Sequence, residues 1–223
     1  PIYKLIKRIE MKQFILLGIL LSAFVSCTKY NQIDTGLAKA KFNGNMYEYF
    51  QSNSYDWDSL LVLIEYTGVK EYFTGEKEGY ENITFFGPTN HSIRRKMFEK
   101  SHWNSNYTEK IYDYHSMREF VDGVGVEQCR TWILRHIVKG KYKVEDIPRG
   151  TSTDAASGIT FESAAGSTFR VFSLQETYAG IPEAGAVVLY IVSTTSIDVA
   201  STDIQPNNGI VHSLAYGYTF GQL

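Results

Sequence analysis

No charge of one sign dominates this sequence, because 22 Lys and Arg stand against 24 Asp and Glu, for a formal net charge of −2. A protein that binds nucleic acid neutralises phosphates with a basic surplus, so a nucleic-acid partner is not expected. The rest of the composition, 43% hydrophobic and 21% charged, is typical of a soluble globular protein and excludes a disordered or fibrous chain. The length fits one large or two small domains.

Catalytic signatures are also missing. The sequence has no Gly-x-Ser-x-Gly nucleophile elbow, no His-Glu-x-x-His helix and no phosphate-binding loop that ends in Lys-Ser/Thr. The Asp56/Asp58 pair does not continue as a calcium loop, because Leu60 and Leu61 stand where an oxygen ligand and a glycine are needed. We therefore expect no enzyme, no cofactor and no metal site, although two of the scattered carboxylates can still pair in space, as glycosidases require.

A membrane-spanning apolar run is absent too. The run Phe14–Val25 has twelve residues, whereas a spanning helix needs about 20. The basic start at Met11-Lys12, this run and the small Ser26 are typical of a secretory signal peptide. Cys27 follows directly, and the junction resembles the lipobox of bacterial lipoproteins, in which the cysteine is acylated and becomes the first mature residue.

The lipobox resemblance implies a division of the N-terminal region. Residues 1–10 are expected to be an upstream extension, residues 11–27 a lipoprotein signal peptide, and residues 28–45 a polar tether. The protein would then be held at the cell envelope by its lipid, as an outer-membrane lipoprotein facing the periplasm or the surface. The alternative is that the apolar run is a buried segment of a soluble domain. With Cys27 acylated, Cys129 has no disulfide partner, and we expect it to be a small buried hydrophobe and not a nucleophile.

Helical spacing marks two segments after the tether. Apolar residues at this spacing are Trp57, Leu60, Leu61 and Ile64 in the first segment, and Val126, Cys129, Ile133 and Ile137 in the second. Ser54 or Asp56 can cap the first helix, and Gly68 suits its end. The second helix is expected to run into Val138 and to stop at Gly140.

Strands are predicted from short apolar or alternating runs. Ile83–Phe86 is expected to be a strand that Gly87-Pro88 ends, because proline has no N–H to donate. Thr89 or Asn90 can then cap a helix through Ile93 and Met97. Four C-terminal runs also read as strands: 159–161, 168–174, the fully buried run 186–192, and 210–214. Since helices precede strands, the expected class is α+β, with one domain over residues 46–223.

Three segments together resemble the fasciclin domain. Thr84-Phe-Phe-Gly-Pro-Thr-Asn90 is similar to the first family motif, usually Thr-Val-Phe-Ala-Pro-Thr-Asn, with Gly87 in place of alanine. Leu134-Arg-His-Ile-Val-Lys-Gly-Lys-Tyr142 is similar to the central stretch of the family. Asn208-Gly-Ile-Val-His-Ser-Leu214 is similar to the second motif, usually Asn-Gly-Val-Ile-His-Val-Ile. They occur in the family's order, and the resemblance covers residues 46–223.

The resemblance implies an adhesion or binding module with mainly structural motif residues. These are Thr84, Phe86, Pro88, Thr89, Asn90, His136, Gly140, Tyr142, Asn208, Gly209 and His212. Lone histidines in apolar surroundings are usually core residues with satisfied hydrogen bonds, and a joint metal site would need a third ligand. The signal peptide, Cys27 and one such domain resemble lipoproteins of Bacteroidota. An accessory role in glycan uptake at the outer membrane is the first alternative, and an uncharacterised envelope enzyme is the second.

One polar segment, Ser101–Ser116, carries several aromatic rings. Trp103 and Tyr107 are the candidate contacts with a protein or glycan of the envelope or the extracellular space, since Trp and Tyr are enriched in interface hot spots. The alternative is that the rings fold back over the core. This alternative is favoured for Tyr112 and Tyr114 and left open for Trp103 and Tyr107.

Overall fold

The structure is a computed structural model that describes residues 40–223. The expected signal peptide, Cys27 and most of the expected tether lie outside the described residues. The end of the tether already pairs with the domain: Lys41 forms a parallel bridge with Gln205, and the Phe42 N–H donates to the Gln205 carbonyl oxygen at 3.0 Å. The packed body therefore includes residues just before Met46.

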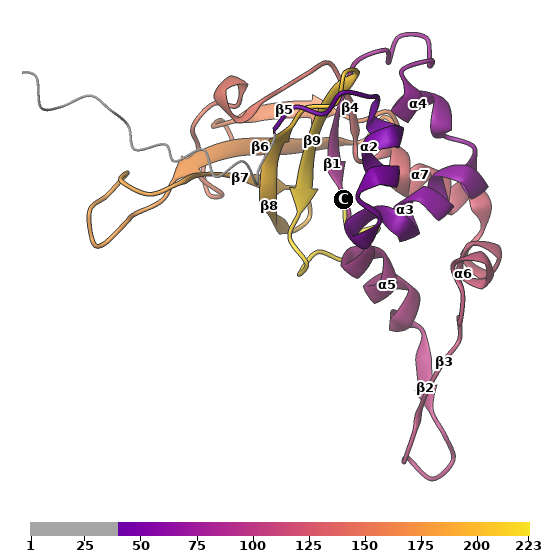
Figure 1. Ribbon diagram of the computed structural model, residues 1–223. Helices are drawn as coiled ribbons and strands as arrows, with labels where there is room; N and C mark the ends of the chain where they lie inside the picture. The colour runs from indigo at the N-terminus through magenta and orange to yellow at the C-terminus, as the bar shows by residue number, and fades with distance from the viewer. Residues whose placement is uncertain (1–39) are drawn as a thin grey trace, which may run out of the picture. The chain divides into compact units, whose positions relative to one another are not determined.

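Helices come first along the chain and strands dominate later, so the α+β class is confirmed (Figure 1). The helices are α2 Met46–Ser52, α3 Ser54–Thr67, α4 Lys70–Thr74, α5 Asn90–Glu99, α6 Met117–Val124 and α7 Val126–Leu134, with a 3-10 turn η1 at Val144–Asp146. The strands are β1 Ile83–Gly87, β2 Ser101–Trp103, β3 Lys110–Tyr112, β4 Ile137–Lys139, β5 Ile159–Glu162, β6 Thr168–Gln175, β7 Val187–Val192, β8 Ser196–Ile204 and β9 Gly209–Leu214.

Seven strands form one sheet in the order β4-β1-β9-β8-β7-β6-β5, and β2 and β3 form a separate pair. Strands β1 and β9 are parallel, and the other neighbours are antiparallel. The two ends of the large sheet also meet. Val138 of β4 bridges to Ser163, which follows β5, and the Ala164 N–H donates to the Ile137 carbonyl oxygen at 2.8 Å. The sheet thus curls back on itself.

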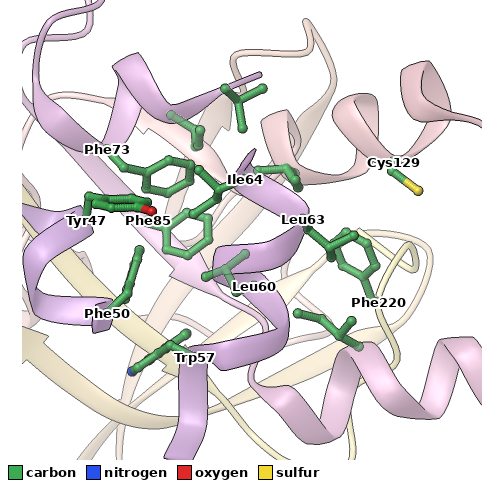
Figure 2. Packing of buried hydrophobic residues seen from close by; sticks show 14 of the residues in the cluster. Tyr47, Phe50, Trp57, Leu60, Leu63, Ile64, Phe73, Phe85, Cys129 and Phe220 are labelled. Atoms are coloured by element: carbon green, nitrogen blue, oxygen red, sulfur yellow. The ribbon is translucent and has the colours of Figure 1, made fainter. Parts of the chain in front are cut away.

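Two hydrophobic clusters lie on opposite faces of β1, because side chains alternate along a strand. Phe85 belongs to the cluster under the helices, together with Phe50, Trp57 and Phe73 (Figure 2). Phe86 belongs to the cluster inside the curled sheet. The predicted strand at Ile83–Phe86 is therefore confirmed, and each of its two phenylalanine rings fills a different core.

Helix α3 follows its predicted stripe with one change. Trp57, Leu60 and Ile64 are buried, whereas Leu61 is half-buried and Leu63 takes a core position. The helix ends as predicted at Gly68, whose φ of 66° lies in the left-handed region that glycine favours. The buried face of α3 thus forms part of the hydrophobic cluster under the helices.

The second helix was predicted to extend too far, because its last predicted residues form a separate strand. Helix α7 ends at Leu134, and Ile137–Lys139 is strand β4, paired with β1. The helix stops because its last turn closes on itself: the His136 N–H donates to the Ile133 carbonyl, and the His136 ring contacts the Trp132 carbonyl at 2.6 Å. The chain is then free to pair with β1, which explains the error.

The run 186–192 is also not fully buried as predicted. Strand β7 buries Leu189 and Ile191 on one face, whereas Val188, Tyr190 and Val192 on the other face are only half-buried. An antiparallel strand with one face on the core needs only alternate apolar residues, and the outward apolar residues of β7 are covered only in part. Strand β8 and helix α6 were not predicted.

Candidate functional site

The three family-like segments meet at one place in the fold. They supply β1, β4 and β9, which lie side by side with β1 in the middle. The motifs can form either a binding site or a scaffold. The contacts of the polar side chains in these strands distinguish the two possibilities.

Thr84 closes the corner after β4. Its hydroxyl donates to the Gly140 carbonyl oxygen and accepts from the Tyr142 N–H, each at 2.8 Å. Gly140 has a φ of 97°, a conformation that a side chain would strain. Thr84 is fully buried, so its hydroxyl is occupied by the backbone and is not offered to a ligand.

Asn90 holds the start of α3 and does not cap its own helix. Its Oδ1 accepts from the Ser59 N–H at 2.6 Å, and its Nδ2 donates to the carbonyls of Ser54 and Tyr55 at 3.1 and 2.7 Å. Of the predicted caps, only Thr89 lies at an N-cap position, and the expected side-chain hydrogen bonds are absent. Thr89 occupies the N-cap position of α5 without a side-chain hydrogen bond, and Asn53 does the same for α3.

Asn208 and Gly209 fix the entry into β9. The Asn208 Oδ1 accepts from the Met46 N–H at 2.7 Å, and its Nδ2 donates to the Phe73 carbonyl at 2.9 Å. A Cβ on Gly209 would lie 2.3 Å from the Ile83 carbonyl oxygen. Glycine is needed there because β1 and β9 approach closely.

Gly87 and Pro88 are buried at the end of β1. A Cβ on Gly87 would lie 2.6 Å from the Trp57 ring. The glycine that replaces the usual alanine of the motif thus makes room for a tryptophan of α3. The prediction that this joint is scaffold fits that packing.

His136 is completely buried and bonded at both ring nitrogens. Its Nδ1 lies 2.6 Å from the Trp132 carbonyl oxygen, which can only accept, so Nδ1 carries the proton. Its Nε2 then accepts from the Tyr218 hydroxyl at 2.9 Å. Burial lowers the pKa of His136 to about 4, so the ring is neutral at pH 7.

His212 has the opposite tautomer. The Asp203 N–H donates to Nδ1 at 3.4 Å, so Nε2 carries the proton and donates to the Tyr142 carbonyl at 2.9 Å. Its ring stacks on Phe86 at 5.3 Å, and burial lowers its pKa as well. Neither histidine has a free nitrogen for catalysis or for a metal.

The lone thiol of the described residues is equally inaccessible. Cys129 is buried in the cluster under the helices, and burial raises its pKa to about 11. A thiol with so high a pKa is a poor nucleophile. Among residues 40–223, no group of three or more His, Cys, Asp and Glu side chains is placed to hold a metal ion.

The aromatic segment forms a projecting hairpin. We call residues Ser101–Tyr112 the arm; its strands β2 and β3 extend beyond helices α5 and α6 (Figure 1). Trp103 is 54% exposed and Tyr107 is 79% exposed, so both rings are open to solvent. The alternative that they cover the core is wrong for these two residues.

The two faces of the arm differ in chemistry because side chains alternate along paired strands. Ser101 pairs with Tyr112 and Trp103 pairs with Lys110, which places these four side chains on one face. The expectation that Tyr112 covers the core is wrong, because this ring is 37% exposed and packs against the exposed Phe98 at 4.8 Å. This face is therefore an aromatic strip that begins on helix α5.

The opposite face carries His102 and Ile111, which are also paired. At the base, the Asp113 carboxylate lies 3.3 Å from His102 Nδ1 and 3.6 Å from Lys100 Nζ. Tyr114 follows and is buried against Phe120, as expected for this ring. Packing of Tyr114 thus holds the base of the arm, and the solvent-exposed contacts of Asp113 add little.

The tip of the arm is a tight turn. The Tyr107 N–H donates to the Asn104 carbonyl at 3.0 Å, and the Asn104 side chain accepts from the Thr108 N–H at 3.0 Å. Tyr107 has a φ of 56°, which is strained for a residue with a side chain. The turn directs the Tyr107 ring into solvent.

Comparisons with known proteins agree with this geometry. The family model for the fasciclin domain matches residues 56–216. A solved FAS1 domain pair from the insect cell adhesion molecule Fasciclin I is similar, with a TM-score of 0.52 and 13% sequence identity, over 79% of this chain and 50% of the solved one. This chain thus spans about half the length of that structure, and at such identity the likeness concerns the fold alone. No curated protein matches the chain.

Proposed function

This chain belongs to the fasciclin domain family, and on that premise we propose that it is a lipid-anchored, extracytoplasmic adhesion module that uses the arm to bind a protein partner. Domains of this family are in general adhesion modules and not enzymes. The anchor is Cys27, in the manner of Bacteroidota lipoproteins, and the place of action is the outer membrane of the cell envelope. Within residues 40–223, no helix is long and apolar enough to cross a bilayer.

The arm is the observation that carries the proposal. A two-stranded hairpin is marginally stable in water on its own, yet here it presents Trp103 and Tyr107 to solvent. Exposed Trp and Tyr rings are the side chains that dominate the binding energy of protein interfaces. The polar motif side chains of the core, by contrast, are already hydrogen-bonded within the protein, except the buried Thr89 hydroxyl, so they leave little for a partner.

The shape of the arm favours a protein over a glycan at this site. A projecting hairpin fits a groove or extends a sheet of a partner protein, whereas small ligands bind in concave sites. Accessory glycan binding in polysaccharide uptake is the second candidate for the arm, because Trp103 and Tyr107 can stack on sugar faces. An envelope enzyme has less support, since the histidines with lowered pKa are buried and fully bonded.

A pulldown from native envelope tests the role of the arm. The double variant Trp103→Ala/Tyr107→Ala should lose the partner that the wild type retains. Tyr178→Ala is a matched control, because Tyr178 is 69% exposed in a different hairpin. If the double variant retained the partner as well as the wild type does, at an unchanged melting temperature, the arm would not be the binding site.

Membrane fractionation tests the anchor separately. Cys27→Ala should move the protein from the membrane fraction to the soluble fraction, because two or more acyl chains give stable anchoring. Retention of Cys27→Ala in the membrane fraction contradicts the lipoprotein assignment and leaves the arm experiment unaffected.

A further inference from the structure

A second candidate site lies at the opposite end of α5 from the arm. An open cavity of about 470 Å³ is lined by Ser54, Tyr55, Asp58, Asn90, His91 and Arg94. The first three residues belong to the start of α3 and the others to the first half of α5. Arg94 is the lining residue nearest to the arm, which begins at Ser101, so the two sites are about 10 Å apart along the axis of α5.

The topology explains why a cavity forms there. Strands β1 and β9 are parallel, and both end next to this place: β1 leads into α5, and β9 leads into the loop with Tyr216. Asn90, only 6% exposed, ties the start of α3 to the start of α5 and so fixes the two walls of the cavity.

Two tyrosine rings stand beside the cavity, and one of them is held in place by several contacts. Tyr216 is half exposed, and its ring lies 4.3 Å from the His91 ring. Its hydroxyl donates to Asp56 at 3.1 Å, and its carbonyl accepts from Arg95 at 2.7 Å. Tyr55 lines the cavity and is 81% exposed. These rings offer flat apolar surfaces next to polar groups.

Two charged groups of opposite sign complete the lining. Asp58 and Arg94 are both exposed, and neither side chain has a hydrogen-bond or ion-pair partner within residues 40–223. A carboxylate accepts hydrogen bonds and a guanidinium donates several in one plane. With one charge of each sign the lining has no formal net charge, which favours a neutral ligand, and its polar groups disfavour an apolar one.

We infer that this cavity binds one or two residues of a neutral oligosaccharide. A sugar ring has an apolar C–H face and a rim of hydroxyls. The face packs on Tyr55 or on the Tyr216–His91 pair, while Asp58 and Arg94 bond hydroxyls on the rim. The inference does not depend on the arm, because no residue of the arm lines the cavity.

Calorimetric titration with four neutral probes tests this inference: cellohexaose, xylohexaose, mannohexaose and maltohexaose. At least one of them should bind the purified protein. Tyr55→Ala and Arg94→Met should each weaken that binding at least about tenfold, as expected for the loss of a stacking ring or of a charged hydrogen-bond donor. Tyr178→Ala, the control, should bind as the wild type does.

Three results would overturn the inference. The first is that none of the four probes binds. The second is that Tyr55→Ala and Arg94→Met bind like the wild type while keeping its melting temperature. The third is that Trp103→Ala/Tyr107→Ala abolishes sugar binding and the cavity variants do not, which would move glycan binding to the arm. Loss of the protein partner in the arm variant alone has no bearing on the cavity.

Discussion

Replacing Asn90 with alanine removes three hydrogen bonds that join the starts of two helices. The Ser59 N–H is buried and loses its acceptor at 2.6 Å, which costs about 1–3 kcal/mol. The carbonyls of Ser54 and Tyr55 are part-buried, so water replaces some of what they lose. The truncated side chain also leaves an unfilled space. The lost hydrogen bonds and this space together should lower the free energy of unfolding by about 3 kcal/mol.

Thermal unfolding followed by circular dichroism measures this loss. For a domain of this size, 1 kcal/mol corresponds to about 2–4 °C, so Asn90→Ala should melt about 6–12 °C below the wild type. Asn106→Ala is the control, because Asn106 is exposed on the arm; its melting temperature should not change. If Asn90→Ala melted within about 2 °C of the wild type, the claim that this motif residue is scaffold would be refuted.

Three further predictions concern the buried residues. Gly209→Ala should lower the urea midpoint strongly, because the added Cβ would lie 2.3 Å from the Ile83 carbonyl oxygen; an unchanged midpoint contradicts the close approach of the two strands. Because burial lowers the pKa of His136 to about 4 and also lowers that of His212, the unfolded chain binds protons first. The free energy of unfolding should therefore be highest above about pH 6.5 and should fall toward pH 4, less steeply in His136→Gln than in the wild type. If urea titrations give the same pH dependence for both proteins, the lowered pKa of His136 is contradicted. Cys129 should react with a thiol reagent only after denaturant is added, because burial raises its pKa to about 11; rapid labelling of that thiol in the native protein, with Cys27 replaced by serine, would show that it is exposed.

Local patterns in the sequence are enough to predict the helices and strands that carry long apolar repeats. Helix α3 has a stripe of large side chains and a glycine at its end, and both features are local. The first motif is likewise local, since its proline ends a short apolar strand. The family resemblance adds the order of these elements, which composition alone does not provide.

Elements defined by distant partners could not be predicted in this way. Strand β4 has only three residues and continues the apolar repeat of α7, so periodicity assigns it to the helix. What makes it a strand is pairing with β1, some fifty positions earlier in the chain. The strands of the arm are equally short, and their polar residues give no apolar alternation to detect.

Side-chain roles depended on distant contacts even more. Asn90 has the right residue type for a local cap, yet its amide bonds the start of another helix more than thirty positions away. The cavity beside Tyr55 could not be predicted, because its two walls, α3 and α5, meet only in the folded chain. Exposure of Trp103 and Tyr107 could be suspected from their polar neighbours, but only the projection of the hairpin places both rings in solvent.

The central claim is that the motif residues hold the fold and the arm binds the partner. Measuring the melting temperature and the envelope-partner affinity of Trp103→Ala/Tyr107→Ala and of Asn90→Ala, side by side and below both melting points, tests it most directly. The account predicts that the arm variant loses affinity and keeps its melting temperature, while Asn90→Ala melts earlier and still binds. The contrary result, with binding kept by the arm variant and lost by folded Asn90→Ala, would place the partner site on the motif.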